Sequence, residues 1–131
     1  MPVVLQKVIR RADLRANPHT LYAFGDNLEA RGKGGQAREM RGEPNAVGIP
    51  TKRAPSMREG AFLVDADLER VRAVADKAFA RLVRHLEAGG TVCLPADGIG
   101  TGLAQLQQRA PAVWAYVNGR IEALKRLEGG T

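Results

Sequence analysis

Short apolar runs, separated by polar and glycine-rich segments, dominate the first half of the chain. Runs of this length that are rich in β-branched or aromatic residues predict strands, and we expect strands at residues 3–8, 21–24, 46–49 and 61–64. The run at residues 91–94 does not alternate with polar positions, which predicts a strand buried on both faces at the centre of an α/β sheet. We expect Pro50 to end the third strand, residues 51–60 to form a surface loop, and residues 12–19 to be irregular.

Two later segments have the period of a helix with one buried side. The first carries an apolar stripe made of Leu68, Val71, Ala75, Ala78, Leu82 and Leu86. Asp65 or Asp67 is placed to cap its start. The second follows Pro111, a residue suited to the first turn of a helix, and its stripe is made of Val113, Trp114, Val117, Ile121, Leu124 and Leu127. One or two further helical turns are expected over residues 36–41.

Strands that alternate with helices predict a single three-layer α/β domain over residues 1–131, with a central mixed or parallel sheet. A chain of 131 residues is long enough to bury a substantial core. In such sheets, ligands bind beyond the carboxyl ends of the strands. That edge is therefore where candidate functional residues should gather.

The chain is basic, with 20 Lys and Arg against 14 Asp and Glu, a net charge of +6. This charge favours anionic partners, including nucleic acid. The arginines are scattered, however, and six aromatic residues offer a poor stacking platform for single strands. No apolar run has the length of a membrane span, and the start lacks the pattern of a signal peptide, so we expect no membrane association and a cytoplasmic location.

Two glycine-rich segments follow predicted strands directly. The first glycine segment comprises residues 24–27 (Phe-Gly-Asp-Asn) and 32–37 (Gly-Lys-Gly-Gly-Gln-Ala), and the second comprises residues 95–102 (Pro-Ala-Asp-Gly-Ile-Gly-Thr-Gly). Glycine lets a backbone approach a ligand closely, and successive free N–H groups form an anion-binding nest. Two nests at one sheet edge predict a ligand with more than one phosphate, or with a phosphate and a ribose. The alternative is that the glycines only make tight turns.

Candidate ligand-binding residues around these nests are Gly25, Gly34, Gly35, Gln36, Lys52, Gly98, Ile99, Gly100, Thr101 and Gly102. Candidate catalytic residues are Asp26, Asn27 and Asp97. The carboxylate of Asp26 or Asp97 near a diphosphate could orient a water for attack at an anomeric carbon, and an Asn at a strand end can hydrogen-bond ribose hydroxyls. Asp26 and Asn27 could instead serve only to make a turn. We expect a β-branched residue at Gly100 to block a phosphate and leave the fold largely intact.

Other chemistries lack their motifs. The spacing around Gly32 and Gly34 does not fit a Rossmann dinucleotide site, and neither a Walker loop nor a Gly-x-Ser-x-Gly elbow occurs. With two separate histidines and one cysteine, the sequence predicts no metal site and no cofactor. We interpret Cys93 as a small buried apolar residue.

The two glycine segments together resemble the ligand loops of macrodomains, over about thirty residues in two patches. The resemblance implies a macrodomain-like α/β fold in which Asn27 contacts the distal ribose, Gly34 and Gly35 lie near the diphosphate, and residues 98–102 cradle a phosphate. It implies binding of ADP-ribose or a related ribose-phosphate nucleotide and, if there is turnover, hydrolysis of an ADP-ribosyl or terminal phosphate bond. Two alternatives stay open: a non-catalytic nucleotide sensor, and a nucleic-acid-binding protein that uses its basic surface.

Overall fold

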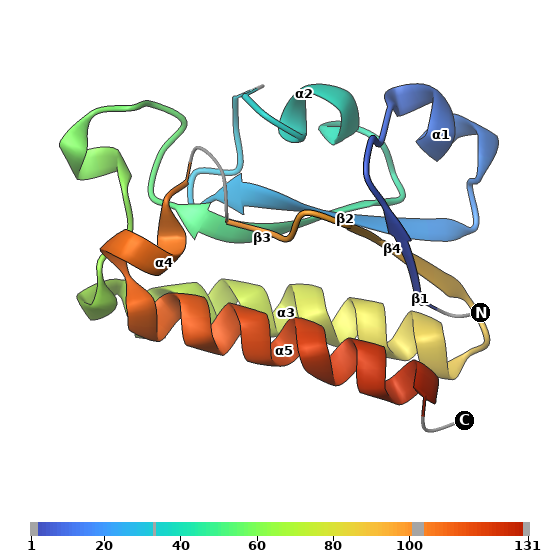
Figure 1. The fold of residues 1–131 in the computed structure, drawn as a ribbon. Helices are drawn as coiled ribbons and strands as arrows, with labels where there is room; N and C mark the ends of the chain where they lie inside the picture. Colours follow the sequence, from blue (N-terminus) through green and yellow to red (C-terminus); the bar gives the residue numbers. More distant parts are fainter. Residues whose placement is uncertain (1–2, 33, 101–103, 130–131) are drawn as a thin grey trace.

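One parallel sheet organises the chain. The computed structural model describes residues 3–32, 34–100 and 104–129. Its strands lie in the order β1-β4-β2-β3 and all pair in parallel (Figure 1). Their bounds are β1 Val3–Gln6, β2 Thr20–Asn27, β3 Ala46–Lys52 and β4 Thr91–Pro95. The predicted α/β class is therefore confirmed, and the sheet is parallel rather than mixed.

Helices cover both faces of this sheet (Figure 1). The long helices α3 (Leu68–Glu87) and α5 (Pro111–Gly129) lie on one face, and the short helices α1 (Arg11–Ala16) and α2 (Ala37–Met40) lie on the other. The remaining elements are α4 (Leu106–Arg109) and the 3₁₀ helices η1 (Glu59–Ala61) and η2 (Asp65–Asp67). This arrangement has three layers, as the alternation of strands and helices predicts.

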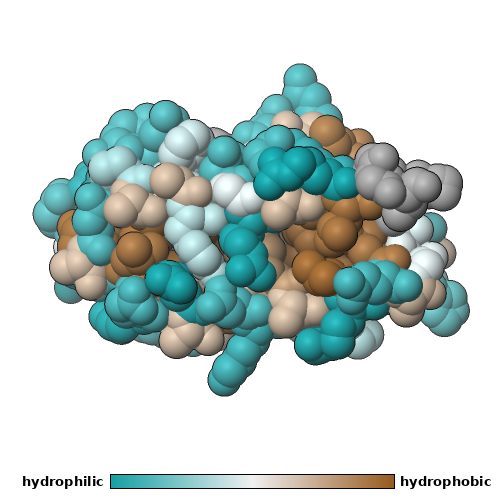
Figure 2. All heavy atoms as spheres, turned by 90° about the horizontal axis from the view of Figure 1, so that it is seen from below, coloured by the Kyte–Doolittle hydropathy of each residue, from teal (hydrophilic) through white to brown (hydrophobic). Residues whose placement is uncertain are grey.

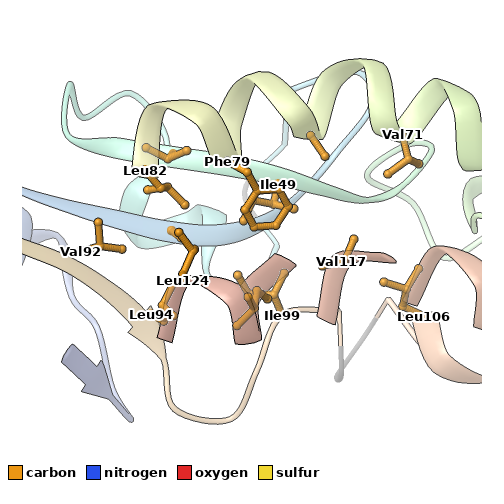
Figure 3. Close-up of a cluster of buried hydrophobic side chains, with 14 of the residues drawn as sticks. Ile49, Val71, Phe79, Leu82, Val92, Leu94, Ile99, Leu106, Val117 and Leu124 are labelled. Atoms are coloured by element: carbon orange, nitrogen blue, oxygen red, sulfur yellow. The ribbon is translucent and has the colours of Figure 1, made fainter. Parts of the chain in front are cut away.

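The larger core lies between the sheet and the long helices (Figure 3). Phe79 is fully buried at its centre, although the predicted stripe of α3 omitted it. Most of the predicted stripe residues of α3 and α5 are buried here, whereas Leu127 is exposed and Trp114 packs against the core while only partly buried. Figure 2 shows the outer side of these helices, where hydrophilic side chains surround groups of apolar ones. Val74 of α3 is 47% exposed.

A smaller core lies on the opposite face, under α1 and α2. Ile9, Leu14, Tyr22, Phe24, Ala37, Met40 and Cys93 form it. The prediction of irregular structure at residues 12–19 is wrong, because α1 occupies Arg11–Ala16. Leu14 is the one residue buried within this helix, so no apolar period exists to reveal it. Asp13 stabilises its start by accepting a hydrogen bond from the Arg10 backbone N–H at 2.8 Å.

The predicted strand at residues 61–64 is also wrong. Phe62 forms only an isolated bridge with Lys52, and the segment lies between the two 3₁₀ helices. Ala61, Phe62 and Leu63 are buried in the absence of a ladder, whereas Val64 is 42% exposed. β3, in contrast, continues through Pro50 to Lys52, because β3 is an edge strand and a missing N–H on its open side breaks no ladder bond.

The two candidate capping aspartates act at different places. Asp67 accepts a hydrogen bond from the Val64 N–H at 2.9 Å, one turn before α3 begins. Asp65 accepts the Ala112 N–H at 2.8 Å and so caps α5 rather than α3.

None of the described helices has the length and apolar character that crossing a membrane requires.

Candidate functional site

The ends of β2 and β4 bring the two glycine segments together. These strands are adjacent and parallel, so both segments leave the same edge of the sheet. They border one cavity of about 540 Å³. The predicted site residues that line it are Gly25, Asp26, Asn27, Gly34, Gly35, Gln36, Lys52, Asp97, Gly98, Ile99 and Gly100. The other two, Thr101 and Gly102, lie outside the described residues.

Arg41, at the end of α2, joins the two parts of the first glycine segment, residues 24–27 and residues 32–37. Its guanidinium donates to the Asp26 carboxylate at 2.5 and 3.3 Å, to the Gly32 carbonyl at 2.6 Å and to the Arg31 carbonyl at 3.2 Å. It also lies 5.7 Å from the centroid of the Phe24 ring. The side chains of Arg41 and Asp26 are only 20% and 10% exposed, so the pair is largely shielded from water. This contact fixes the shape of the cavity wall.

The absence of a side chain at Gly48 makes room for this ion pair. A Cβ on Gly48 would lie 2.6 Å from Oδ2 of Asp26, which is too close for any side chain. Sequence reasoning named Asp26 but gave no role to Arg41 or Gly48. The sequence gives little indication of either residue. Arg41 pairs with Asp26, which is 15 positions away, and the place of Gly48 beside Asp26 depends on the register of β2 with β3.

Asn27 uses its side chain within the loop. Its Nδ2 donates to the Arg31 carbonyl at 2.7 Å, and its Oδ1 accepts the Glu29 N–H at 3.0 Å. Its own N–H donates to Oδ1 of Asp26 at 2.8 Å. This is the turn-forming role that the sequence left open. These bonds use one of the two amide hydrogens and one of the two acceptor positions of the oxygen. The catalytic role of Asn27 stays a prediction.

Lys52, at the end of β3, supplies positive charge to the cavity. Its Nζ donates to the Ser56 carbonyl, lies 3.6 Å from the sulfur of Met57, and is 4.8 Å from the centroid of the Phe62 ring. Burial lowers the pKa of its ammonium below the usual value. Within the described part of the chain no carboxylate forms an ion pair with Lys52. An anionic ligand could therefore neutralise this charge.

The second glycine segment is anchored in the core. The Ile99 side chain is 5% exposed and packs into the larger core (Figure 3), while Asp97 is exposed beside the cavity. Gly100 has φ +81°, and a Cβ there would lie 2.8 Å from Cδ2 of Leu106 and 3.2 Å from Cγ2 of Thr51. The expectation that a β-branched residue at position 100 leaves the fold intact is therefore wrong. Gly100 is required by packing and backbone conformation.

Gln36 lines the cavity, but its amide oxygen Oε1 lies beneath the surface, with no hydrogen-bond donor from the described residues.

Cys93 is buried in the sheet at 2% exposure, where desolvation by burial, with a smaller contribution from Asp13, raises its pKa to about 11. A thiol with that pKa is protonated at neutral pH and does not act as a nucleophile.

Across residues 3–32, 34–100 and 104–129, no three His, Cys, Asp or Glu side chains gather in a way that could hold a metal ion. The candidate chemistry of the site therefore rests on loop backbone, Lys52, Gln36 and the two aspartates at the cavity.

Comparison with known proteins gives one match. No curated protein and no solved structure matches the chain. Residues 4–120 match the protein family described as "Family of unknown function (DUF7831)". Since this match spans most of the chain, the protein belongs to that family.

Proposed function

We propose that this protein binds ADP-ribose or a related ribose-phosphate nucleotide in the cavity at the carboxyl edge of its sheet. The observation that carries the proposal is the meeting of two glycine segments, from the adjacent strands β2 and β4, around one cavity that also contains Lys52. Backbone N–H groups in such segments, together with a cation, are suited to phosphate oxygens. The resemblance of both segments to macrodomain ligand loops supports the same ligand class.

The dimensions and charge of the cavity agree with this ligand class. A volume of about 540 Å³ falls within the range of small-molecule sites, which is roughly 300–1,000 Å³. Lys7, Arg31 and Lys52 line it together with the Asp26–Arg41 pair and Asp97. Apolar side chains, including Pro55, Met57, Ile99 and Ala104, complete the wall and could contact a base or the faces of a sugar.

If the protein turns over its ligand, we propose hydrolysis by a water that a carboxylate orients. Asp26 is held by Arg41 and accepts the Asn27 N–H, so this carboxylate is already occupied within the wall. Asp97 is exposed beside the cavity, where water can reach its carboxylate, and we propose it as the base. In this version, Asp97→Ala lowers the rate on an ADP-ribosylated substrate and keeps the affinity for ADP-ribose, whereas Asp26→Ala lowers stability.

Calorimetric titration tests the binding proposal. We expect saturable binding of ADP-ribose at one site, compared in the same experiment with NAD, ATP and nucleoside monophosphates. Gly34→Leu adds a side chain to the cavity wall at a position where a Cβ meets no atom within 4 Å, and it should weaken binding at least tenfold. Gly119→Leu is the matched control, since its Cβ also meets nothing within 4 Å and it lies on the exposed side of α5.

Two results would contradict the proposal. One is the absence of heat with every nucleotide at millimolar concentration. The other is equal weakening by the Gly34 and Gly119 substitutions, which would mean that the bound ligand does not occupy the cavity. An affinity that increases with polymer length and falls steeply with salt would point instead to nucleic acid on the basic surface.

A further inference from the structure

One loop supplies the accessible apolar surface of the cavity. Residues 53–58, between β3 and η1, place Pro55 and Met57 in the cavity lining. Both residues are exposed, and Met57 is 54% exposed. The other apolar side chains in the described lining are buried, namely Ala37, Pro95, Ile99 and Ala104. An apolar part of a ligand in this cavity therefore finds its largest contact surface at Pro55 and Met57.

Contacts on both sides hold this loop in position. The Arg53 N–H donates to the Ala61 carbonyl at 2.8 Å, and the Arg53 guanidinium donates to Asp67 at 2.9 Å. Pro55 lies directly against the first glycine segment, since a Cβ on Gly32 would be 2.5 Å from Cβ of Pro55. The apolar surface is therefore formed before a ligand arrives, which limits the entropy that binding would cost.

A positive charge lies beside the exposed methionine. Nζ of Lys52 is 3.6 Å from the sulfur of Met57. An ammonium has three N–H donors, and one of these goes to the Ser56 carbonyl. Within the described residues no carboxylate forms an ion pair with Lys52. A ligand that matches both groups carries a negative charge and, close to it, an apolar surface.

A nucleotide has this combination, because a single ribose joins its phosphate to an aromatic base. A thioether makes favourable contacts with aromatic rings, with the sulfur about 5 Å from the ring. Proline offers no side-chain hydrogen bond and methionine only a weak acceptor, so this surface suits the face of a base and does not read its edge. Inorganic phosphate or a sugar phosphate would leave the same surface in water.

We propose that Pro55 and Met57 form the base subsite of the cavity, with the base packed on Met57 and the adjoining phosphate at Lys52. This inference rests on the proposed function and deepens it, since it makes the base a determinant of affinity beside the phosphates and the ribose. The base subsite follows β3, whereas Asp97 follows β4, and β2 lies between these strands. The base and the bond proposed to be hydrolysed therefore occupy different parts of the cavity.

Methyl NMR tests this contact directly. The chain contains three methionines, so protein labelled at its methionine methyl groups gives few signals, and Met57→Leu identifies the signal of Met57. ADP-ribose should move this signal upfield, because the face of an aromatic ring shields a methyl group above it. The signal of Met40 is the internal control, since Met40 is fully buried in the smaller core and is not part of the cavity lining.

Calorimetric titration of variants measures what the contact contributes to affinity. Met57→Ala should bind ADP-ribose about tenfold more weakly, as the loss of its apolar and sulfur–aromatic contacts predicts. Val74→Ala is the matched control and should keep the wild-type affinity, because Val74 is 47% exposed on α3 and outside the cavity lining. Each unliganded variant should melt within about 2 °C of the wild type, since both side chains are exposed.

The outcomes separate this inference from the proposed function. If ADP-ribose binds and the Met57 signal does not move upfield, the base lies elsewhere, so the inference is wrong and the proposed function stands. The same conclusion follows if Met57→Ala keeps the affinity of Val74→Ala. If the wild-type protein does not bind ADP-ribose, the inference falls together with the ADP-ribose form of the proposed function.

Discussion

Replacement of Gly100 by alanine should destabilise the protein strongly, whereas the same change at Gly34 should not. Both glycines line the cavity, and sequence alone gives them equivalent roles. In the structure, Gly100 has φ +81° and faces packed side chains, while a Cβ at Gly34 meets nothing within 4 Å and needs no positive φ. The pair therefore separates a glycine required by the fold from one that the fold does not require.

The magnitude at Gly100 has two parts. An L-residue in the left-handed region costs roughly 1–2 kcal/mol. The new Cβ would also lie 2.8 Å from Cδ2 and 3.1 Å from Cβ of Leu106, and 3.2 Å from Cγ2 of Thr51. Leu106 is 1% exposed and cannot turn outward, so overpacking adds about 1–3 kcal/mol. After the gain of about 0.4–1 kcal/mol from a less flexible unfolded chain, the net loss is about 1–5 kcal/mol.

Thermal and urea unfolding, followed by far-UV circular dichroism, measure this difference. For a chain of this length about 4 °C corresponds to 1 kcal/mol, so Gly100→Ala should melt roughly 4–20 °C below the wild type. Gly34→Ala should match the wild type or exceed its free energy of unfolding by up to about 1 kcal/mol. If the two variants differ by less than about 0.5 kcal/mol, the packing described around Gly100 is wrong.

Three further predictions concern other described residues. Native Cys93 should resist a thiol reagent and react only on unfolding, since burial raises its pKa to about 11; rapid labelling of the folded protein would contradict this. For Asp67, burial raises the pKa, but hydrogen bonds from a backbone N–H and from Arg53, with further charge attraction, outweigh it and hold the pKa below 3.8. On acidification, the Asp67 carboxylate therefore binds a proton in the unfolded chain before it does so in the folded protein. Stability is lost as the pH falls from about 3.8 through the lower folded pKa. Asp67→Asn should flatten that part of a curve of unfolding free energy against pH. Arg41→Met should cost about 2–3 kcal/mol in urea unfolding because it leaves Asp26 unpaired in the cavity wall, and adding Asp26→Asn should recover part of the loss; strict additivity of the two changes would argue against the ion pair.

The sequence predicts those parts of the fold in which apolar residues follow one regular pattern over consecutive positions. The apolar run at residues 91–94 predicts a central strand, and β4 is flanked by β1 and β2. The long helices carry apolar stripes of several turns, which is why α3 and α5 were predicted. Helix α1 has a single buried residue, Leu14, and carries no such stripe. The apolar residues at positions 61–64 have the composition of a strand, because three of them are buried although the segment forms only an isolated bridge.

The residues of the candidate site fall into the same two groups, those that the sequence predicts and those that it does not. The glycines and Asp26 were visible as motifs after strands, and the parallel order of β2 and β4 explains why they meet. Arg41 could not be assigned, because its partner Asp26 is 15 residues away and the contact exists only once α2 packs beside β2. The contrast between Gly34 and Gly100 was likewise invisible, since it depends on the position of Leu106 and on a backbone angle.

The order of strands in the sheet also sets the order in which the cavity can be completed during synthesis. β1 leaves the ribosome first, yet its partner is β4, with Val3 beside Val92, so β1 has no neighbour until residues 91–95 have emerged. β2 and β3 can pair earlier because they pair with each other. β4 then enters between β1 and β2, and it brings the second glycine segment against the first. The same step joins β1 to the sheet, and Lys7, the residue that follows β1, lines the cavity. A nascent chain that stops before β4 therefore holds only half of the cavity. If the cavity binds a nucleotide as proposed, that binding is a late event in the maturation of this protein.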